Sequence, residues 1–316
     1  MLAILPKLLP VFALIALGAL LGRRGFLSEA FADGAKRLIA SVSLPALLFM
    51  AFSRMSLQAS HLYLAVVVFA SCGLLALVSL PLAALARLPQ PATRMLFQGF
   101  EAGMLGYALF TSLFGNDALG YFAGADLGQV LYVFTVLMAQ LLAGESGNRI
   151  NSAELSRRLV SSPVIVAIGA GLASAAFAPG AIGLPWAPGA ALDPSLTAIG
   201  SLTTPLVCLV VGFGLRNGVE GGGRGLAQAA LAALLRIGFA GALGLLVAFV
   251  VAPALGFERM QSLALLTLFV MPPPFVIAVF RKRPEDSSYV SSVLSLHTLA
   301  SLAAALAIAL AIGGAL

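Results

Sequence analysis

The chain has 316 residues, of which 60% are hydrophobic and 9% charged, and its mean hydropathy is +1.05. Soluble globular domains carry about 45–50% apolar and about 25% charged residues. This composition excludes a soluble enzyme, a nucleic-acid-binding module and a disordered protein. The 18 Lys and Arg against 12 Asp and Glu therefore reflect the placement of loops beside a membrane and not a nucleic-acid partner. The sequence predicts an all-α integral membrane protein.

Ten apolar runs follow one another along the chain, and each is long enough to approach or exceed the roughly 20 residues of a membrane crossing. They fall at about 4–22, 37–53, 60–86, 95–115, 119–143, 161–178, 195–215, 226–253, 261–281 and 288–312. The basic pair Arg23–Arg24 follows the first run instead of preceding it, so we expect a retained helix and not a cleaved signal peptide.

The basic residues are distributed unevenly between the two sets of loops that ten helices create. One set carries fourteen of them, the other carries only Lys7, Arg54 and Arg259, and Arg236 lies within a run. Loops rich in Lys and Arg stay in the cytoplasm. We therefore expect a multi-pass protein of the cell (inner) membrane with both termini outside the cytoplasm.

Two halves of opposite orientation, at about 1–143 and 161–316, are suggested by a weak internal repeat. The segment Ser-Val-Ser-Leu-Pro at 41–45 parallels Ser-Leu-Thr-Thr-Pro at 201–205. The fourth run has a centre interrupted by Gly103 and Gly106, and the ninth by three consecutive prolines at 272–274. Interrupted segments at corresponding positions of two halves are typical of the binding site of a secondary transporter.

Both interruptions are expected near the middle of the membrane. At 1.5 Å per residue, Pro272 lies about 16 Å below the outer face and the two glycines lie about 12–16 Å above the inner face, in a hydrocarbon core of roughly 30 Å. The half-helices that start at Tyr107 and Phe275 would then direct their N-termini at one point. Two such helix ends with free amides favour an anion.

Several motifs occur in the order found in one transporter family. The chain opens with Leu-Pro-Val-Phe-Ala-Leu-Ile-Ala-Leu-Gly at 9–18 and Arg-Arg-Gly at 23–25. These are followed by Ser-Leu-Pro-Ala-Leu-Leu-Phe at 43–49, Gly-Met-Leu-Gly at 103–106 and Phe-Val-Met-Pro at 269–272. In these features the chain resembles the auxin efflux carrier family, which includes bacterial permeases for malonate and malate.

The resemblance implies an architecture and a mode of action. It implies ten helices in two inverted five-helix repeats, with broken helices 4 and 9 crossing at their interruptions. It also implies a scaffold of helices 1, 2, 6 and 7 that mediates a homodimer. Helices 3–5 and 8–10 would form a transport domain that moves as an elevator.

The expected substrate site surrounds the crossover. Its residues come from helices 4 and 9, with one proline each from helices 2 and 7: Glu101, Gly103, Gly106, Tyr107, Met271, Pro272, Pro273, Pro274, Phe275, Pro45 and Pro205. Family members usually carry Asn where this chain has Glu101, often a second Asn where it has Val276, and Pro where it has Ala108. Those asparagines are thought to hold the substrate carboxylate, so the departures leave the identity of the substrate open.

Four ionisable residues within the runs are candidates for ion coupling: Glu101, Asp126, Arg236 and His297. Charged side chains at membrane depth are costly and often functional. Glu101 carries a proton or cation in one interpretation and is a structural partner in the other. Arg236 counters a substrate carboxylate or forms a static ion pair with Glu101 or Asp126. Asp126 lines a wet vestibule or takes part in coupling, and His297 relays protons or packs through hydrogen bonds.

The leading functional hypothesis is a secondary transporter of small organic anions such as malonate, malate or auxin-like acids. The coupling ion is H⁺ or Na⁺, and proton coupling passes through Glu101. A cation/proton antiporter or sodium-coupled symporter of related crossover fold is the alternative within transport, and a membrane receptor or structural subunit is the alternative outside it. Neither an enzyme, a cofactor nor a metal site is expected, because no nucleotide-binding loop, catalytic triad or metal-ligand spacing occurs.

Overall fold

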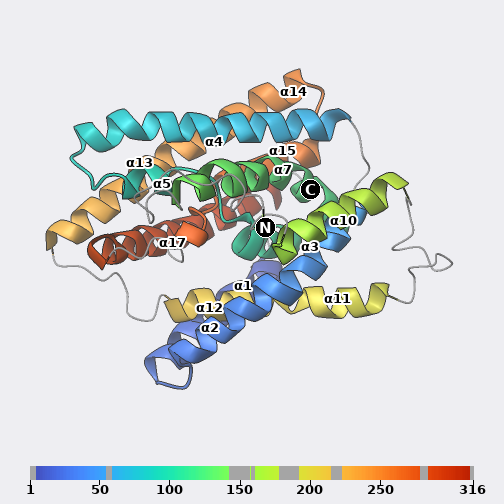
Figure 1. Ribbon diagram of the computed structural model, residues 1–316, viewed down its shortest axis with the longest axis horizontal. Helices are drawn as coiled ribbons and strands as arrows, with labels where there is room; N and C mark the ends of the chain where they lie inside the picture. The colour runs from blue at the N-terminus through green and yellow to red at the C-terminus, as the bar shows by residue number, and fades with distance from the viewer. Residues whose placement is uncertain are drawn as a thin grey trace.

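The computed structural model describes residues 5–54, 59–141, 157, 161–177, 192–214, 223–277 and 284–313. Within these ranges every regular element is a helix (Figure 1). Six helices are long and apolar enough to cross a membrane: Glu29–Ser53, Leu62–Leu85, Leu119–Leu141, Asp193–Gly214, Gly225–Ala254 and Tyr289–Ile308. Two shorter apolar helices are Phe12–Arg23 and Pro163–Phe177. The protein is therefore an all-α, multi-pass membrane protein.

The first half of the chain contains the elements up to residue 141. They are α1 (Leu5–Arg23), α2 (Glu29–Leu38), the π-helical turn η1 (Ile39–Ser43), α3 (Leu44–Ser53), α4 (Ala59–Leu85), α5 (Ala92–Leu96), the π-helical turn η2 (Ala102–Gly106), α6 (Tyr107–Phe114), the 3₁₀ turn η3 (Asn116–Ala118), α7 (Leu119–Tyr132) and the π-helical turn η4 (Val133–Leu137). The helices α2, η1 and α3 run on as one rod, as do α7 and η4.

The second half contains α10 (Pro163–Phe177), α11 (Asp193–Ser201), α12 (Thr203–Gly214), α13 (Gly223–Leu246), the π-helical turn η5 (Val247–Val251), α14 (Ala252–Ala254), α15 (Arg259–Phe269) and α17 (Pro284–Gly313). The helices α11 and α12 are consecutive, and so are α13, η5 and α14. Most predicted runs coincide closely with the observed helices, except at the start of the second run and where the chain is interrupted.

The second helix starts earlier than its apolar run. It begins at Glu29, because the Ser28 hydroxyl accepts a hydrogen bond from the Phe31 amide at 3.2 Å and caps the helix. Lys36 and Arg37 lie on this helix, and both are exposed. The extra turns are polar, so hydropathy alone places the start too late, at about residue 37.

Four large interfaces between helices dominate the packing, and they fall into two sets of two. The helix α1 packs along α12, and α10 packs along α3. The helix α4 packs along α7, and α13 packs along α17. In Figure 1, α10 and α3 lie together at the right, while α13 and α17 run in a similar direction. The largest interfaces therefore join helices of opposite halves in one set and helices of the same half in the other.

Glycines allow the backbones of the first set to approach closely. A Cβ atom on Gly18 of α1 would clash with the carbonyl oxygen of Leu209 on α12. A Cβ atom on Gly171 of α10 would lie 2.9 Å from the carbonyl oxygen of Phe49 on α3. Small residues at such crossings let helices pack by van der Waals contact where lipid removes the hydrophobic driving force.

The two ends of the bundle differ in the loops that they carry. In Figure 1 the C-terminal end of α4 and the N-terminal ends of α13 and α17 lie at the left. The ends of α3 and α10 and the start of α11 lie at the right. The described connection between α4 and α5, which carries Arg87 and belongs to the predicted basic set, follows the left end of α4.

Two glycines of α12 provide a test of this packing. A Cβ atom on Gly212 would clash with the carbonyl oxygen of Ile15, whereas one on Gly214 would meet nothing within 4 Å. Overpacking a close interface costs about 1–3 kcal/mol. We therefore expect Gly212→Leu to lower the melting temperature of the detergent-solubilised protein and Gly214→Leu to leave it unchanged. Equal melting temperatures for the two variants would contradict the α1–α12 interface.

Candidate functional site

The fourth membrane segment is interrupted between α5 and η2. Residues 97–101 are non-helical, and Gly99 has φ +69°, a conformation that side chains with a Cβ atom rarely adopt. Gly103 and Gly106, which we expected to form the interruption, instead lie in the helical turn η2 that restarts the segment. The prediction of an interruption is confirmed, but its position is about four residues too late. A positive φ at Gly99 is not visible from hydropathy.

The ninth segment is interrupted at the three prolines. The helix α15 ends at Phe269, and residues 270–275 are non-helical, with Pro272, Pro273 and Pro274 inside this stretch. Val276 and Ile277 are helical again, and residues 278–283 lie outside the described part of the chain. Consecutive prolines lack the amide hydrogens that a helix needs, so this interruption falls where the sequence predicts it.

The two interruptions meet, and Glu101 joins them twice. Its backbone amide donates a hydrogen bond to the Pro272 carbonyl oxygen at 2.8 Å. Its carboxylate oxygen Oε2 accepts one from the Phe275 amide at 2.6 Å. Pro274 also lies against Gly99, where an added Cβ would be 3.0 Å from the proline Cγ atom. The crossover is therefore a direct contact between segments more than 170 residues apart.

Side chains from two further helices satisfy the carbonyl groups that the first interruption frees. Arg236 of α13 donates from Nη1 to the Phe97 carbonyl at 2.7 Å and from Nη2 to the Gly99 carbonyl at 2.6 Å. Gln129 of α7 donates to the Phe100 carbonyl at 2.6 Å. The Arg236 guanidinium also lies 5.3 Å from the centre of the Phe100 ring. Non-helical backbone is tolerated at membrane depth only with such partners.

This arrangement corrects one expectation for Arg236. The residue is fully buried, but its hydrogen bonds go to backbone carbonyls, and it forms no ion pair with Glu101 or Asp126. A static ion pair is therefore wrong. The interrupted backbone orients the guanidinium, because the Phe97 and Gly99 carbonyl oxygens both lie within hydrogen-bonding distance of its two terminal nitrogens.

Asp126 and Tyr107 form a second polar pair beside the crossover. Both side chains are almost fully buried and near enough to interact electrostatically. Glu101 acts on Asp126 in the same way. Neither the Tyr107 hydroxyl nor Asp126 Oδ1 has a hydrogen-bond partner within the described residues. The rings of Tyr107 and Phe122 pack edge to face at 4.9 Å and position the tyrosine.

Parts of α3 and α12 approach the crossover. A Cβ atom on Gly103 would lie 3.3 Å from the Leu44 side chain, next to Pro45, and α12, which contains Pro205, contacts η2. Gly103, Pro45 and Pro205 are all half-buried. Several of the expected lining residues thus lie on elements that contact one another. Gly106 packs inward, because a Cβ atom added to it would lie 2.7 Å from the Phe122 ring.

His297 lies apart from the two carboxylates. It is buried in α17, and its Nδ1 atom lies 3.1 Å from the Ser301 hydroxyl. Arg236 acts on it electrostatically. Its Nε2 atom has no hydrogen-bond partner among the described residues. Met271 is also buried, and its backbone amide bonds to the Leu268 carbonyl, so it belongs to the turn after α15.

Three polar residues at this site were not singled out as binding residues from the sequence. Gln129 supports the interruption, and Ser43 and Thr203 are buried with hydroxyl oxygens that lack a partner in the described ranges. Ser43 and Thr203 occupy the same place in the two matching segments, each two residues before a proline. That position in the internal repeat is the signal that identifies them.

The arrangement defines a multi-pass helical membrane protein with a polar crossover between two interrupted helices. Comparison of the chain with models of known protein families and with curated protein sequences finds no match.

The support that Arg236 gives to the interruption can be measured. Arg236→Met removes both donors and leaves two buried carbonyl groups unpaired, at a cost of about 2–5 kcal/mol. We expect a clear loss of thermal stability in detergent, and a smaller loss for Arg236→Lys, which keeps one donor group in place. The exposed Arg24→Met is the matched control. If Arg236→Met and Arg24→Met have the same melting temperature, the arginine does not stabilise the interruption.

Proposed function

We propose that the protein is a secondary active transporter of small organic anions, with the crossover as its substrate site. The observation that carries the proposal is the carboxylate of Glu101 on the Phe275 amide. A carboxylate bound between two interrupted helices indicates that this place has the chemistry to hold a substrate carboxylate. It also implies that, in this conformation, the chain occupies its own anion site.

The charges around the crossover determine how a substrate would enter. Glu101 and Asp126 are carboxylates, and the Arg236 guanidinium lies beside the ring of Phe100, the residue that precedes Glu101. An added anion would be repelled by an ionised Glu101, and the repulsion is strong at low dielectric. Protonation of Glu101 would release the Phe275 amide to the substrate. Anion binding and proton uptake are then linked, and each favours the other.

The inverted five-helix repeats belong to this proposal, and helix packing supports them. If α1 and α10 are equivalent, and α3 and α12 likewise, the α1–α12 and α10–α3 interfaces are the same contact made twice. The glycine contacts agree, since Leu209 and Phe49 are related by the same offset as the two matching segments. The pairs α4–α7 and α13–α17 match in the same way.

The domains of an elevator follow from these interfaces. The helices α1, α3, α10 and α12 would be the scaffold and would form a homodimer. The helices α4, α7, α13 and α17 would carry the two interrupted segments. The six long helices, the two shorter ones and the two interrupted segments together support ten crossings with both termini outside.

A cation-coupled or cation-transporting mechanism is the second candidate. The observation that favours it is the buried Asp126 with an unpaired carboxylate oxygen beside Tyr107 and Glu101. Two carboxylates in a buried site suit a proton or sodium ion more than a second anion. Sodium dependence of substrate binding would distinguish this candidate from proton coupling through Glu101.

Binding of malonate or malate to the purified protein tests proton coupling. Wild type should bind more tightly as the pH falls from about 8 to 5, because protonated Glu101 leaves the Phe275 amide. Glu101→Gln mimics the protonated state, so it should bind without this pH dependence. Asp117→Asn, which alters an exposed carboxyl group, should behave as wild type. Equal binding by wild type at both pH values would refute coupling through Glu101.

Labelling from either side tests the topology. Phe26, between α1 and α2, is 83% exposed and Phe177, at the end of α10, is 89% exposed. In a background without the buried Cys72 and Cys208, we expect Phe26→Cys to react with a membrane-impermeant maleimide only from the cytoplasm. Phe177→Cys should react only from outside. The reverse pattern, or both cysteines on one side, would contradict the proposed orientation.

A further inference from the structure

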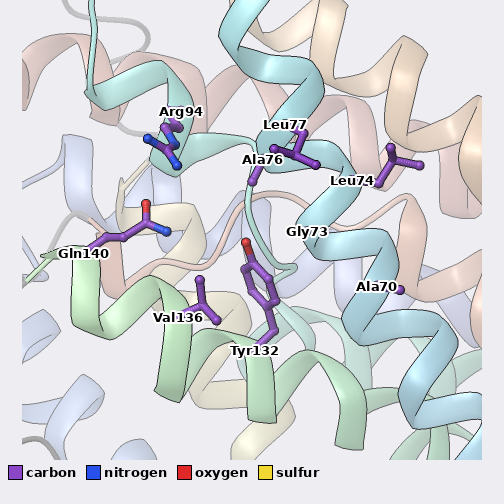
Figure 2. A pocket seen from close by; sticks show the side chains of 9 residues that line it. All are labelled: Ala70, Gly73, Leu74, Ala76, Leu77, Arg94, Tyr132, Val136 and Gln140. Carbon is purple, nitrogen blue, oxygen red and sulfur yellow. The ribbon is translucent and has the colours of Figure 1, made fainter. Parts of the chain in front are cut away.

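A hollow of about 450 Å³ lies between α4 and the α7–η4 rod, and its lining residues Tyr132 and Gln140 hydrogen-bond to Gln98 of the first interruption (Figure 2). Small and apolar residues of α4 form one wall, and Tyr132, Val136 and Gln140 form the other. Arg94 of α5 stands at one end of it. The hollow therefore combines a long apolar wall with a single cationic end.

Arg94 has no anionic partner within the described part of the chain. No hydrogen bond or ion pair joins its guanidinium to another described residue, and its Nε atom is buried without a partner. The neighbouring polar groups, in contrast, satisfy one another. Gln98 and Gln140 exchange hydrogen bonds at 2.9 and 3.0 Å, and the Tyr132 hydroxyl donates to Gln98 at 3.0 Å. An uncompensated guanidinium beside neutral, saturated groups favours an external anion.

The apolar wall runs along α4 toward the middle of the bundle. Ala70 and Leu77 are seven residues apart, which is about 10 Å along a helix. Leu74 and Leu77 are 47% and 62% exposed, so the hollow opens onto a surface that faces lipid in a multi-pass membrane protein. Gly73 keeps it open, since an added Cβ would already contact the Tyr132 ring at 3.8 Å.

We infer that this groove binds an anionic glycerophospholipid, with its phosphate on Arg94 and an acyl chain along α4. Arg94 lies in the short helix α5, which follows the connection that carries Arg87, and basic pockets between helices on the cytoplasmic side bind anionic head groups. A small free acid would leave most of the apolar wall uncovered, whereas an acyl chain covers it. The inference does not depend on the transported substrate.

Lipid binding to the full chain tests the inference directly. Delipidated protein in detergent is mixed with phosphatidylglycerol or phosphatidylcholine of the same chain length, and bound lipid is counted by native mass spectrometry. We expect wild type to retain phosphatidylglycerol preferentially. Arg94→Gln should weaken phosphatidylglycerol binding about fivefold, which is the factor for one basic contact worth about 1 kcal/mol. Arg24→Gln removes an exposed arginine and should leave phosphatidylglycerol binding unchanged.

A second variant tests the apolar wall and does not touch the arginine. Gly73→Leu fills the groove and should lower phosphatidylglycerol binding, while Ala84→Leu, on an exposed position of the same helix, should not. Equal retention of the two lipids by wild type, or equal binding by Arg94→Gln and Arg24→Gln, would overturn the proposal. Displacement of phosphatidylglycerol by millimolar inorganic phosphate or malonate would show an anion site that needs no acyl chain, and would also overturn it.

Discussion

An interrupted helix inside a membrane must find donors for the carbonyl groups that its missing turn would have paired. Water cannot supply them in the hydrocarbon core, and each unpaired group costs several kcal/mol. Here Arg236 and Gln129 reach the interruption from two different helices and pair the carbonyls of Phe97, Gly99 and Phe100. The crossover therefore exists only when α5, α7 and α13 are assembled, and the position of each of these helices is tied to it.

This requirement explains why a charged residue can be fully buried without a carboxylate partner. The charge of the Arg236 guanidinium is stabilised by the dipoles of two backbone carbonyls and by the face of the Phe100 ring. Glu101 accepts a hydrogen bond from the Phe275 backbone amide, and Asp126 lies beside Tyr107. The arginine is thus held by backbone carbonyls, and the Glu101 carboxylate is held by a backbone amide.

Hydropathy and composition predict the helices well because burial in lipid demands long apolar runs. They also predict the prolines at 272–274 as an interruption, since three missing amides allow no continuous helix. They place the other interruption too late, because it depends on the positive φ of Gly99 and on donors from distant helices. The sequence shows that Glu101, Arg236 and Asp126 are unusual, but the choice among their partners is made by tertiary geometry.

Glu101 is held at the crossover by two independent bonds, one from its main chain and one from its side chain. The backbone bond to Pro272 can persist when the carboxylate leaves the Phe275 amide. Movement of that carboxylate involves side-chain torsions, which are far faster than the sliding of helices. Recognition of a ligand and displacement of a domain would be two separate events, and the first could equilibrate many times before each occurrence of the second.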